Sequence, residues 1–465
     1  MNESDSSHSD KQGLLSSTSS EKKKSMGAKI LALGDGEDED EIASEIDKEL
    51  NAEAFRMGVN GRRLLYLGML CSVLFMNQIG FSMLNIADSS QLQYMPGIFF
   101  LAFFTTTTEW IEKHGLWRTT LLSIAIQMFA ILFAMKGGSY GRTAGSIMNG
   151  IAMCFLYNQI TTFSCTWFGI RGRIVATGIQ LFFANLGYWS AVWADYDNKY
   201  KISNDFFNDS FLGIGVANLF LLFIIAFFYE AKPEDCPSKS QAIYKRVDYD
   251  LQRDFEVLKD ERIFKRGFSM LCVLLIITYF SPYCVRWHYS KLVHSDHRDG
   301  EVIHFVIVPL MQLSGLVVST ILLARYFRFK VQLTIVIWAN VIAIILCEAG
   351  LLDGTHVLFY IGYILESFFI GCLQIIIYEL VVELSFPVSP ALALSSLHLV
   401  AFPSILVLNA ISDDINMRNQ TSSVINDCLQ FIQAGILAFI AIGIWQLSYR
   451  LKRIEFDLGE GTARQ

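Results

Sequence analysis

Residues 230–267 read EAKPEDCPSKSQAIYKRVDYDLQRDFEVLKDERIFKRG and form the one long polar connection within an otherwise apolar stretch of chain. The connection holds nine basic and nine acidic residues. Of the 465 residues in the chain, 53% are hydrophobic and only 17% are charged, whereas an ordinary soluble domain has about 25% charged residues. This composition excludes a soluble globular enzyme, a disordered protein and a nucleic-acid-binding protein.

A helical pattern lies inside this linker. Apolar residues recur every three or four positions, at Ile243, Val247, Leu251, Phe255 and Leu258. This spacing is typical of an amphipathic helix, so we expect one here.

Apolar runs flank the linker on both sides. A membrane-spanning helix needs about 20 mainly apolar residues. The sequence predicts about twelve such spans, six before and six after the linker: 64–86, 93–108, 119–136, 143–167, 174–194, 211–229, 268–289, 302–325, 331–350, 356–381, 391–411 and 427–449. We therefore expect an all-α membrane protein with about twelve transmembrane helices in two pseudo-symmetric six-helix bundles. The expected domains are a cytosolic tail at 1–57, a bundle at 58–229, a cytosolic linker at 230–267, a bundle at 268–449 and a cytosolic tail at 450–465.

Basic residues are unevenly divided between the two sides of this topology. With the N-terminus in the cytosol, the short segments on that side carry twelve Lys and Arg residues, and the opposite loops carry seven. Cytosolic loops are enriched in Lys and Arg, so this division supports a cytosolic location for both termini. Asn419, in an Asn-Gln-Thr sequon, then faces the lumen and is the expected glycosylation site.

The first 57 residues contain no apolar run, which predicts disorder and excludes a signal peptide. They include Asp10-Lys-Gln-Gly-Leu14-Leu15. This motif resembles the acidic dileucine signal that clathrin adaptors read when they sort membrane proteins to endosomes and lysosomes. A motif this short also arises by chance. We expect a lysosomal or endosomal membrane, with the plasma membrane as the alternative.

The loop after the second span reads Trp110-Ile-Glu112-Lys113-His-Gly115-Leu-Trp-Arg118. It resembles the loop signature of the major facilitator superfamily, whose two six-helix halves face a substrate site near the membrane midplane. Gly115 allows a sharp reversal of the backbone, and the charges of Glu112, Lys113 and Arg118 can hold neighbouring helix ends together. The alternative is an ordinary cytosolic loop that is basic for topological reasons.

Two longer stretches are similar to one family in particular. They read Thr166-Trp-Phe-Gly-Ile-Arg-Gly-Arg173-Ile-Val-Ala-Thr-Gly, followed by Ala184-Asn185-Leu-Gly187, and Tyr378-Glu379-Leu-Val-Val-Glu383-Leu-Ser-Phe-Pro387-Val-Ser. They resemble the fourth loop with the fifth helix, and the tenth helix with its following loop, of the feline leukaemia virus subgroup C receptor-related transporters. The resemblance implies facilitative or proton-linked movement of choline, ethanolamine, haem or, in a lysosomal branch, pyridoxine.

The resemblance also implies a cation-binding pocket. The family's aromatic position on the first helix falls on Phe81, where Trp is usual, and its glutamine on the fifth helix falls on Asn185. Its glutamine on the eleventh helix falls on Phe402, and its seventh-helix aromatic positions fall near Tyr279 and Trp287. Aromatic rings can hold a cation through their faces, at ~0.5–2 kcal/mol per contact.

Ionisable residues inside the spans are costly, at ~2.5–3.5 kcal/mol each, and usually functional. Glu366 lies near the middle of the tenth span and is a candidate for proton coupling or for holding a cation; a carboxyl satisfied by a neighbouring helix is the alternative. Arg286 follows Pro282 in the seventh span. Proline can kink a helix, and a gate bends at such a point. Arg286 either pairs with Glu348 or Glu366, meets an anionic substrate, or extends to the lumenal interface.

Uncharged polar residues also lie at membrane depth, where each needs a hydrogen-bond partner: Asn77, Asn158, Gln159, Gln180, Asn185, Gln312, Gln374 and His398. Of these, we take Asn77, Gln159, Asn185, Gln374 and His398, with the aromatic residues above, as candidates to line the substrate site. For each residue, contact between helices is the alternative.

Motifs for metal or cofactor chemistry are missing from the sequence. His398 has no second ligand at position i+4, and there is no Cys-x-x-Cys pair, no phosphate-binding loop and no nucleophile elbow. We therefore expect no enzyme, no bound metal and no cofactor.

These observations predict a secondary transporter that moves a small organic solute across an endolysosomal membrane by alternating access, facilitatively or linked to protons. A choline-like or vitamin-like cation is the favoured solute, and the expected partners are the lipid bilayer and a clathrin adaptor. The alternative is a non-transporting membrane receptor or trafficking scaffold with a degenerate transporter fold.

Overall fold

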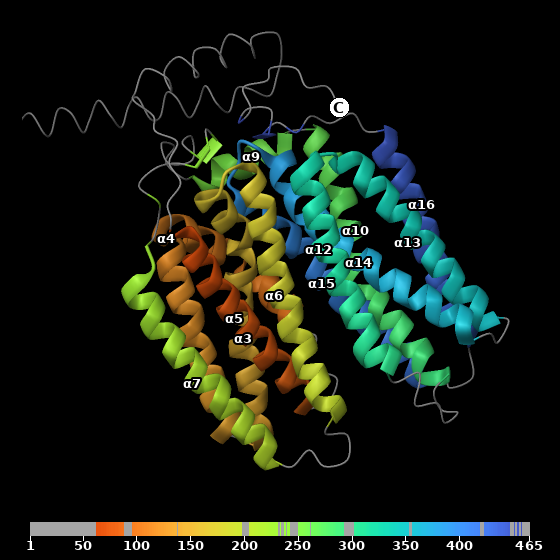
Figure 1. Ribbon diagram of the computed structural model, residues 1–465, viewed down its shortest axis with the longest axis horizontal. Coiled ribbons are helices and arrows are strands. Elements are labelled where there is room, and N and C mark those ends of the chain that lie inside the picture. The colour runs from red at the N-terminus through yellow and green to blue at the C-terminus, as the bar shows by residue number, and fades with distance from the viewer. Residues whose placement is uncertain are drawn as a thin grey trace, which may run out of the picture.

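The structure is a computed structural model (Figure 1), and it describes residues 62–87, 95–136, 138–197, 204–230, 233, 237–238, 240–241, 250–260, 262–292, 302–352, 356–418, 423–446, 451, 453–454 and 457. The regular structure of these residues is helical. The first five helices make up the N-terminal half: α3 (Arg63–Ala87), α4 (Met95–Lys136), α5 (Gly138–Trp167), α6 (Ile170–Asp197) and α7 (Asn204–Phe228).

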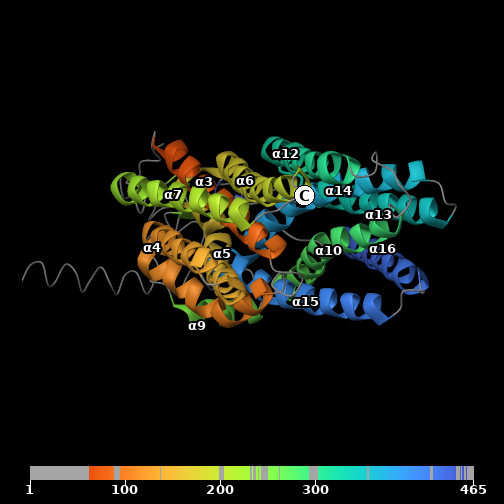
Figure 2. The same ribbon diagram turned by 90° about the horizontal axis from the view of Figure 1, so that it is seen from below.

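The C-terminal half follows the linker helix α9 (Leu251–Asp260). It consists of α10 (Arg262–Leu292), the short π-helix η3 (Ile303–Ile307), α12 (Val308–Tyr326), α13 (Phe329–Leu352), α14 (His356–Ser385), α15 (Pro390–Arg418) and α16 (Ser423–Gln446). Each of the twelve expected spans therefore has a helical counterpart in the structure. Figures 1 and 2 show the helices of the two halves as two neighbouring groups.

Helix α4 contains the second and third expected spans in one continuous element. Its backbone departs from helical geometry at Gly115, where φ is 79° and ψ is 173°. Side chains with a Cβ atom rarely adopt such a positive φ. Gly115 therefore lets the chain reverse direction between the second and third expected spans.

The outer surface of the bundle is apolar. Phe227 on α7 and Phe439 on α16 are 78% and 76% exposed, and such large exposed apolar side chains fit a surface that faces lipid. By length and composition, seven helices of the described part can cross a membrane, among them α12, α13 and α14. The protein is thus a multi-pass membrane protein.

Contacts between the halves run along two seams. Helix α6 of the N-terminal half packs against α12 and α14, and α15 of the C-terminal half packs against α4 and α5. Helix α9 lies at one end of the bundle (Figure 1). We call this the linker end, because Ser240 of the linker and the C-terminal residues Arg453, Ile454 and Asp457 also pack there.

Part of the predicted linker helix lies within the described residues. Helix α9 begins at Leu251, and residues 242–249, which include Ile243 and Val247, lie outside the described residues. Asp254 and Leu258 are buried, whereas Phe255 is 48% exposed. Neighbouring residues in a helix point about 100° apart, so a face centred on Asp254 and Leu258 turns Phe255 outward. Burial raises the pKa of the Asp254 carboxyl above its usual range, although Arg253 opposes the shift.

Candidate functional site

A hydrogen-bonded chain of polar side chains connects the two halves in the interior of the bundle. Asn158 on α5 donates to the hydroxyl of Thr107 on α4 at 3.0 Å, and its amide oxygen lies 2.8 Å from Nδ1 of His398 on α15. The other ring nitrogen of His398, Nε2, lies 2.9 Å from the hydroxyl of Tyr378 on α14. Asn158, Tyr378 and His398 are all buried. We call Thr107, Asn158, Tyr378 and His398 the central cluster.

Aromatic rings surround this central cluster. The ring of His398 lies 6.1 Å from that of Tyr157 on α5 and 5.2 Å from that of Phe402 on α15, centroid to centroid. The ring of Tyr279 on α10 lies 5.4 Å from that of Phe402. Four helices, α5, α10, α14 and α15, thus bring rings and neutral polar groups to one place between the halves.

Three side chains of α6, in the N-terminal half, form hydrogen bonds to the C-terminal half. The Asn185 amide donates to Oε1 of Gln374 at 2.9 Å. The indole N–H of Trp189 donates to Oε1 of Gln312 at 3.0 Å. Beyond it, the indole of Trp193 donates to the Phe305 carbonyl. Asn185 and Gln374, two of the predicted substrate residues, therefore bind each other across the seam.

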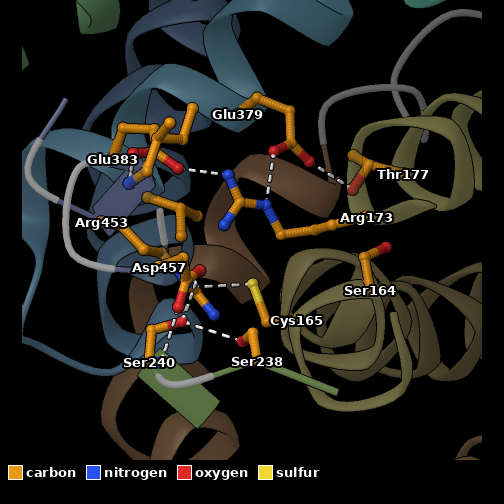
Figure 3. A network of polar contacts seen from close by, with 12 residues as sticks. Ser164, Cys165, Arg173, Thr177, Ser238, Ser240, Glu379, Glu383, Arg453 and Asp457 are labelled. Carbon is orange, nitrogen blue, oxygen red and sulfur yellow. Dashed lines mark hydrogen bonds and ion pairs between the residues drawn. The ribbon is translucent and has the colours of Figure 1, made fainter. Parts of the chain in front are cut away.

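At the linker end, a buried ion-pair network joins the halves (Figure 3). Nε of Arg173, on α6, lies 3.0 Å from Oε2 of Glu379, and a terminal nitrogen of the same guanidinium binds Glu383. Thr177, one turn further along α6, donates to the other oxygen of Glu379 at 2.5 Å. Arg173, Glu379 and Glu383 are almost fully buried, so water contributes little to satisfying these charges.

The predicted loop motif divides between contacts within and between the halves. Glu112 accepts a hydrogen bond from the Ser389 hydroxyl just before α15. Lys113 pairs with Glu109 on its own helix at 3.0 Å, and Arg118 is exposed. Close by, the Thr108 and Ser395 hydroxyls lie 2.6 Å apart across the α4–α15 seam. Glu112 is thus the charged motif residue that contacts the opposite half.

Several predicted site residues lie within one half. Asn77 donates to the Asn149 side chain at 3.1 Å, a contact between α3 and α5. Gln159 accepts from Thr120 at 3.2 Å, a contact between α5 and α4. Phe81 is a buried residue of α3. The hydrogen bonds of Asn77 and Gln159 thus join helices of the N-terminal half to one another.

Glu366 is buried inside the C-terminal half. Its carboxylate accepts a hydrogen bond from Ser281 on α10 and lies 3.8 Å from the Cys347 thiol on α13. A carboxyl group thus lies among three helices of one half, α10, α13 and α14. Along α14 it is separated from Tyr378 of the central cluster by twelve residues, a rise of about 18 Å.

Other predicted residues cannot be placed. Asp10, Leu14, Leu15 and Asn419 lie outside the described residues, as do the side chains of Pro282, Arg286 and Trp287. Within the described residues, no group of three or more His, Cys, Asp and Glu side chains could hold a metal ion.

Sequence reasoning missed the partners of the predicted residues. Tyr378 stood out only as part of a motif, and Trp189 did not stand out at all. Arg173, Glu379 and Glu383 all lie in the two family-like stretches. The signal available in the sequence was the Glu-x-x-x-Glu spacing, which presents two carboxylates on one helix face and so indicates a nearby cation.

Comparison with known proteins identifies the fold. No protein-family model and no curated protein sequence matches the chain. Among solved structures, one crystal structure of the E. coli fucose:proton symporter FucP has a TM-score of 0.60 at 13% identity, over 83% of this chain and 100% of FucP. FucP in the outward conformation has a TM-score of 0.59 at 12% identity, over 83% and 100% of the two chains.

The proton:xylose symporter XylE, bound to 6-bromo-6-deoxy-D-glucose, has a TM-score of 0.55 at 12% identity, over 84% of this chain and 98% of XylE. All three structures are major facilitator transporters and not enzymes. The chain therefore has the major facilitator fold that its six-plus-six layout predicts.

Proposed function

We propose that the protein is a secondary transporter that moves a small organic solute by alternating access. The observation that carries this proposal is the central cluster, whose hydrogen bonds run from Thr107 and Asn158 of one half to His398 and Tyr378 of the other. A solute that competes for these hydrogen bonds is contacted by both halves at once. Its binding then biases how the halves sit against each other, as transport requires.

The rings around the central cluster support a solute with a cationic or aromatic part. Tyr157, Tyr279 and Phe402 offer ring faces, and His398, Tyr378 and Asn158 offer neutral hydrogen-bonding groups. Ring faces attract cations. Together with the resemblance to the choline and pyridoxine transporters, this set favours a choline-like or vitamin-like cation as substrate.

Glu366 is the proposed coupling residue. It is buried at membrane depth beside a hydroxyl and a thiol, and buried carboxyls of this kind are frequent in proton-driven transporters. The similar structures FucP and XylE are named as proton symporters, which supports a proton-linked cycle. Because Glu366 lies inside the C-terminal half, it would act by changing the packing of α10, α13 and α14 and not by touching the solute.

The proposed location is an endolysosomal membrane, with the linker end facing the cytosol. The excess of Lys and Arg in the segments at that end supports this orientation. The dileucine motif at Asp10, Leu14 and Leu15 supports sorting by a clathrin adaptor.

The test is uptake into proteoliposomes that contain the purified protein, with labelled choline, ethanolamine, pyridoxine, fucose and xylose offered one at a time. Tyr378→Phe removes only the hydroxyl that binds His398. We expect it to raise the half-saturating concentration about tenfold, since one hydrogen bond in a buried network is worth ~1–1.5 kcal/mol.

The matched control is Tyr188→Phe, the same change at a tyrosine of α6 that is 37% exposed, and it should leave uptake unchanged. If no solute is taken up by a protein that is folded and correctly inserted, the receptor or scaffold alternative replaces the transporter. If uptake occurs and both variants behave alike, the substrate site lies elsewhere.

A further inference from the structure

The described residues of the C-terminal segment, Leu451, Arg453, Ile454 and Asp457, pack against the bundle at the linker end. Leu451 and Ile454 are buried, and Arg453 is only 1% exposed. Burial of an arginine is costly unless its charge and its donors are satisfied. The general excess of basic residues near membrane surfaces does not explain why Arg453 is buried, so its contacts must stabilise it there.

This segment contacts both halves of the protein at adjacent residues. Nη1 of Arg453 lies 2.9 Å from Sγ of Cys165, on α5 of the N-terminal half. The next residue, Ile454, donates its backbone N–H to Oε2 of Glu383, on α14 of the C-terminal half, at 3.1 Å. The other oxygen of Glu383 binds Arg173. One carboxylate is thus shared between the ion pair that joins the halves and the C-terminal segment.

The segment is also fixed to the linker that connects the halves. The backbone N–H and the hydroxyl of Ser240 donate to the two oxygens of Asp457, at 2.7 and 3.0 Å. Nε of Arg453 donates to the same Ser240 hydroxyl at 3.1 Å. Figure 3 shows Arg453, Asp457 and Ser240 beside the ion pairs of Arg173.

Charge balance links these contacts to one another. In the network of Figure 3, two guanidinium groups, Arg173 and Arg453, face three carboxylates, Glu379, Glu383 and Asp457. Removing one cation raises the excess of negative charge among these five groups from one to two at the place where the halves meet, and uncompensated buried charge is strongly unfavourable.

We propose that Arg453, Ile454 and Asp457 act together as a strap that holds the linker end of the transporter closed. The strap rests on the proposed alternating-access function, which requires the halves to separate at this end in part of the cycle. Separation moves Cys165 away from Glu383, so the segment must release one of them. The strap therefore sets how readily this end opens, and whatever displaces Arg453, Ile454 and Asp457 favours the open state.

Hydrogen exchange of the full-length protein in lipid nanodiscs, followed by mass spectrometry, tests the strap. Arg453→Ala and Asp457→Asn should speed exchange at the linker end, in the peptides around 160–173 and 379–389, on the order of tenfold or more. Arg173→Ala removes the ion pair between the halves and should open the same peptides. Arg328→Ala, at an exposed arginine of the described part, is the matched control and should leave them unchanged.

The strap is overturned if Arg173→Ala opens the linker end while Arg453→Ala and Asp457→Asn exchange like the wild type. If none of the three variants speeds exchange at the linker end, both the strap and the ion-pair closure of that end are ruled out. If Arg453→Ala does not fold, Ser240→Ala takes its place. This change removes the hydrogen bonds of the Ser240 hydroxyl to Asp457 and Arg453 and keeps every charge. Because exchange needs no substrate, opening in a protein that moves none of the tested solutes would support the strap and count against transport alone.

Discussion

Arg173 and Glu379 are 206 positions apart in the chain, yet their side chains meet at 3.0 Å inside the protein, one from each half. Their contact shows that the linker end is closed in this structure. A buried pair between rigid bodies acts differently from a surface pair, because each charge depends on the other for its solvation.

The first prediction concerns this pair. Replacing Arg173 by Ala leaves Glu379 and Glu383 as buried charges with one cation fewer, so the free energy of unfolding should fall by ~3–5 kcal/mol. Glu109→Gln breaks the exposed pair with Lys113 and should change stability by less than ~0.5 kcal/mol. Thermal unfolding of both variants in the same detergent makes the comparison. Equal melting temperatures would mean that the network does not stabilise the folded protein.

The second prediction uses the close approach of α6 to α12. A Cβ atom added to Gly178 would lie 2.3 Å from Oγ1 and 2.5 Å from Cγ2 of Thr320. Gly178→Ala should therefore push the halves apart and lower stability by ~1–3 kcal/mol. Adding Thr320→Ala removes both clashing atoms and should restore most of the loss. A double variant no more stable than Gly178→Ala alone would show that the two halves do not meet closely at this point.

The third prediction concerns coupling. Glu366→Gln keeps the shape of the side chain but fixes it in an uncharged form. If Glu366 carries the coupled proton, substrate exchange should persist while net flux driven by a pH gradient is lost. Ser281→Ala, which removes the hydroxyl bound to Glu366, should shift the pH dependence of flux without abolishing it. Equal responses to the gradient in the wild type and in Glu366→Gln would assign Glu366 a purely structural role.

The fourth prediction concerns sorting. Changing Leu14 and Leu15 to Ala should move the full-length protein from lysosomes to the plasma membrane, because the clathrin adaptor loses its hydrophobic contact. Microscopy of the tagged protein, with Asn2→Ala as a neighbouring change outside the motif, is the measurement. Unchanged lysosomal staining would remove the motif from the account of location.

The helices could be predicted from the sequence because membrane depth imposes a length and a composition on each span. The first span is expected at 64–86 and is observed as α3, Arg63–Ala87. The eighth span is expected at 302–325 and is observed as η3 followed by α12. The ninth span is expected at 331–350 and is observed as α13. Gly115 is expected in a turn, and its φ of 79° is one that glycine adopts easily.

The partners of polar residues could not be predicted in the same way. Asn77 and Asn158 are both amides in apolar spans, yet one binds Asn149 within its own half and the other binds His398 across the seam. Which side of a helix faces the opposite half depends on how the halves dock, and this cannot be derived from the sequence of a single span. Arg453 escaped notice because a basic residue just after the last span satisfies the rule for cytosolic loops.

The polar contacts of α6 have a consequence for how the halves can move. Arg173, Thr177, Asn185, Trp189 and Trp193 bind the opposite half at spacings that are multiples of four residues. Four residues turn an α-helix by about 400°, so each such step shifts the contact by about 40° around the axis. The contacts therefore wind around α6, which explains why its partners change from α14 to α12 and then to η3. Pulling the halves straight apart would break all five contacts together, whereas tilting α6 against the opposite half can break the contacts at one end of the helix while those at the other end persist.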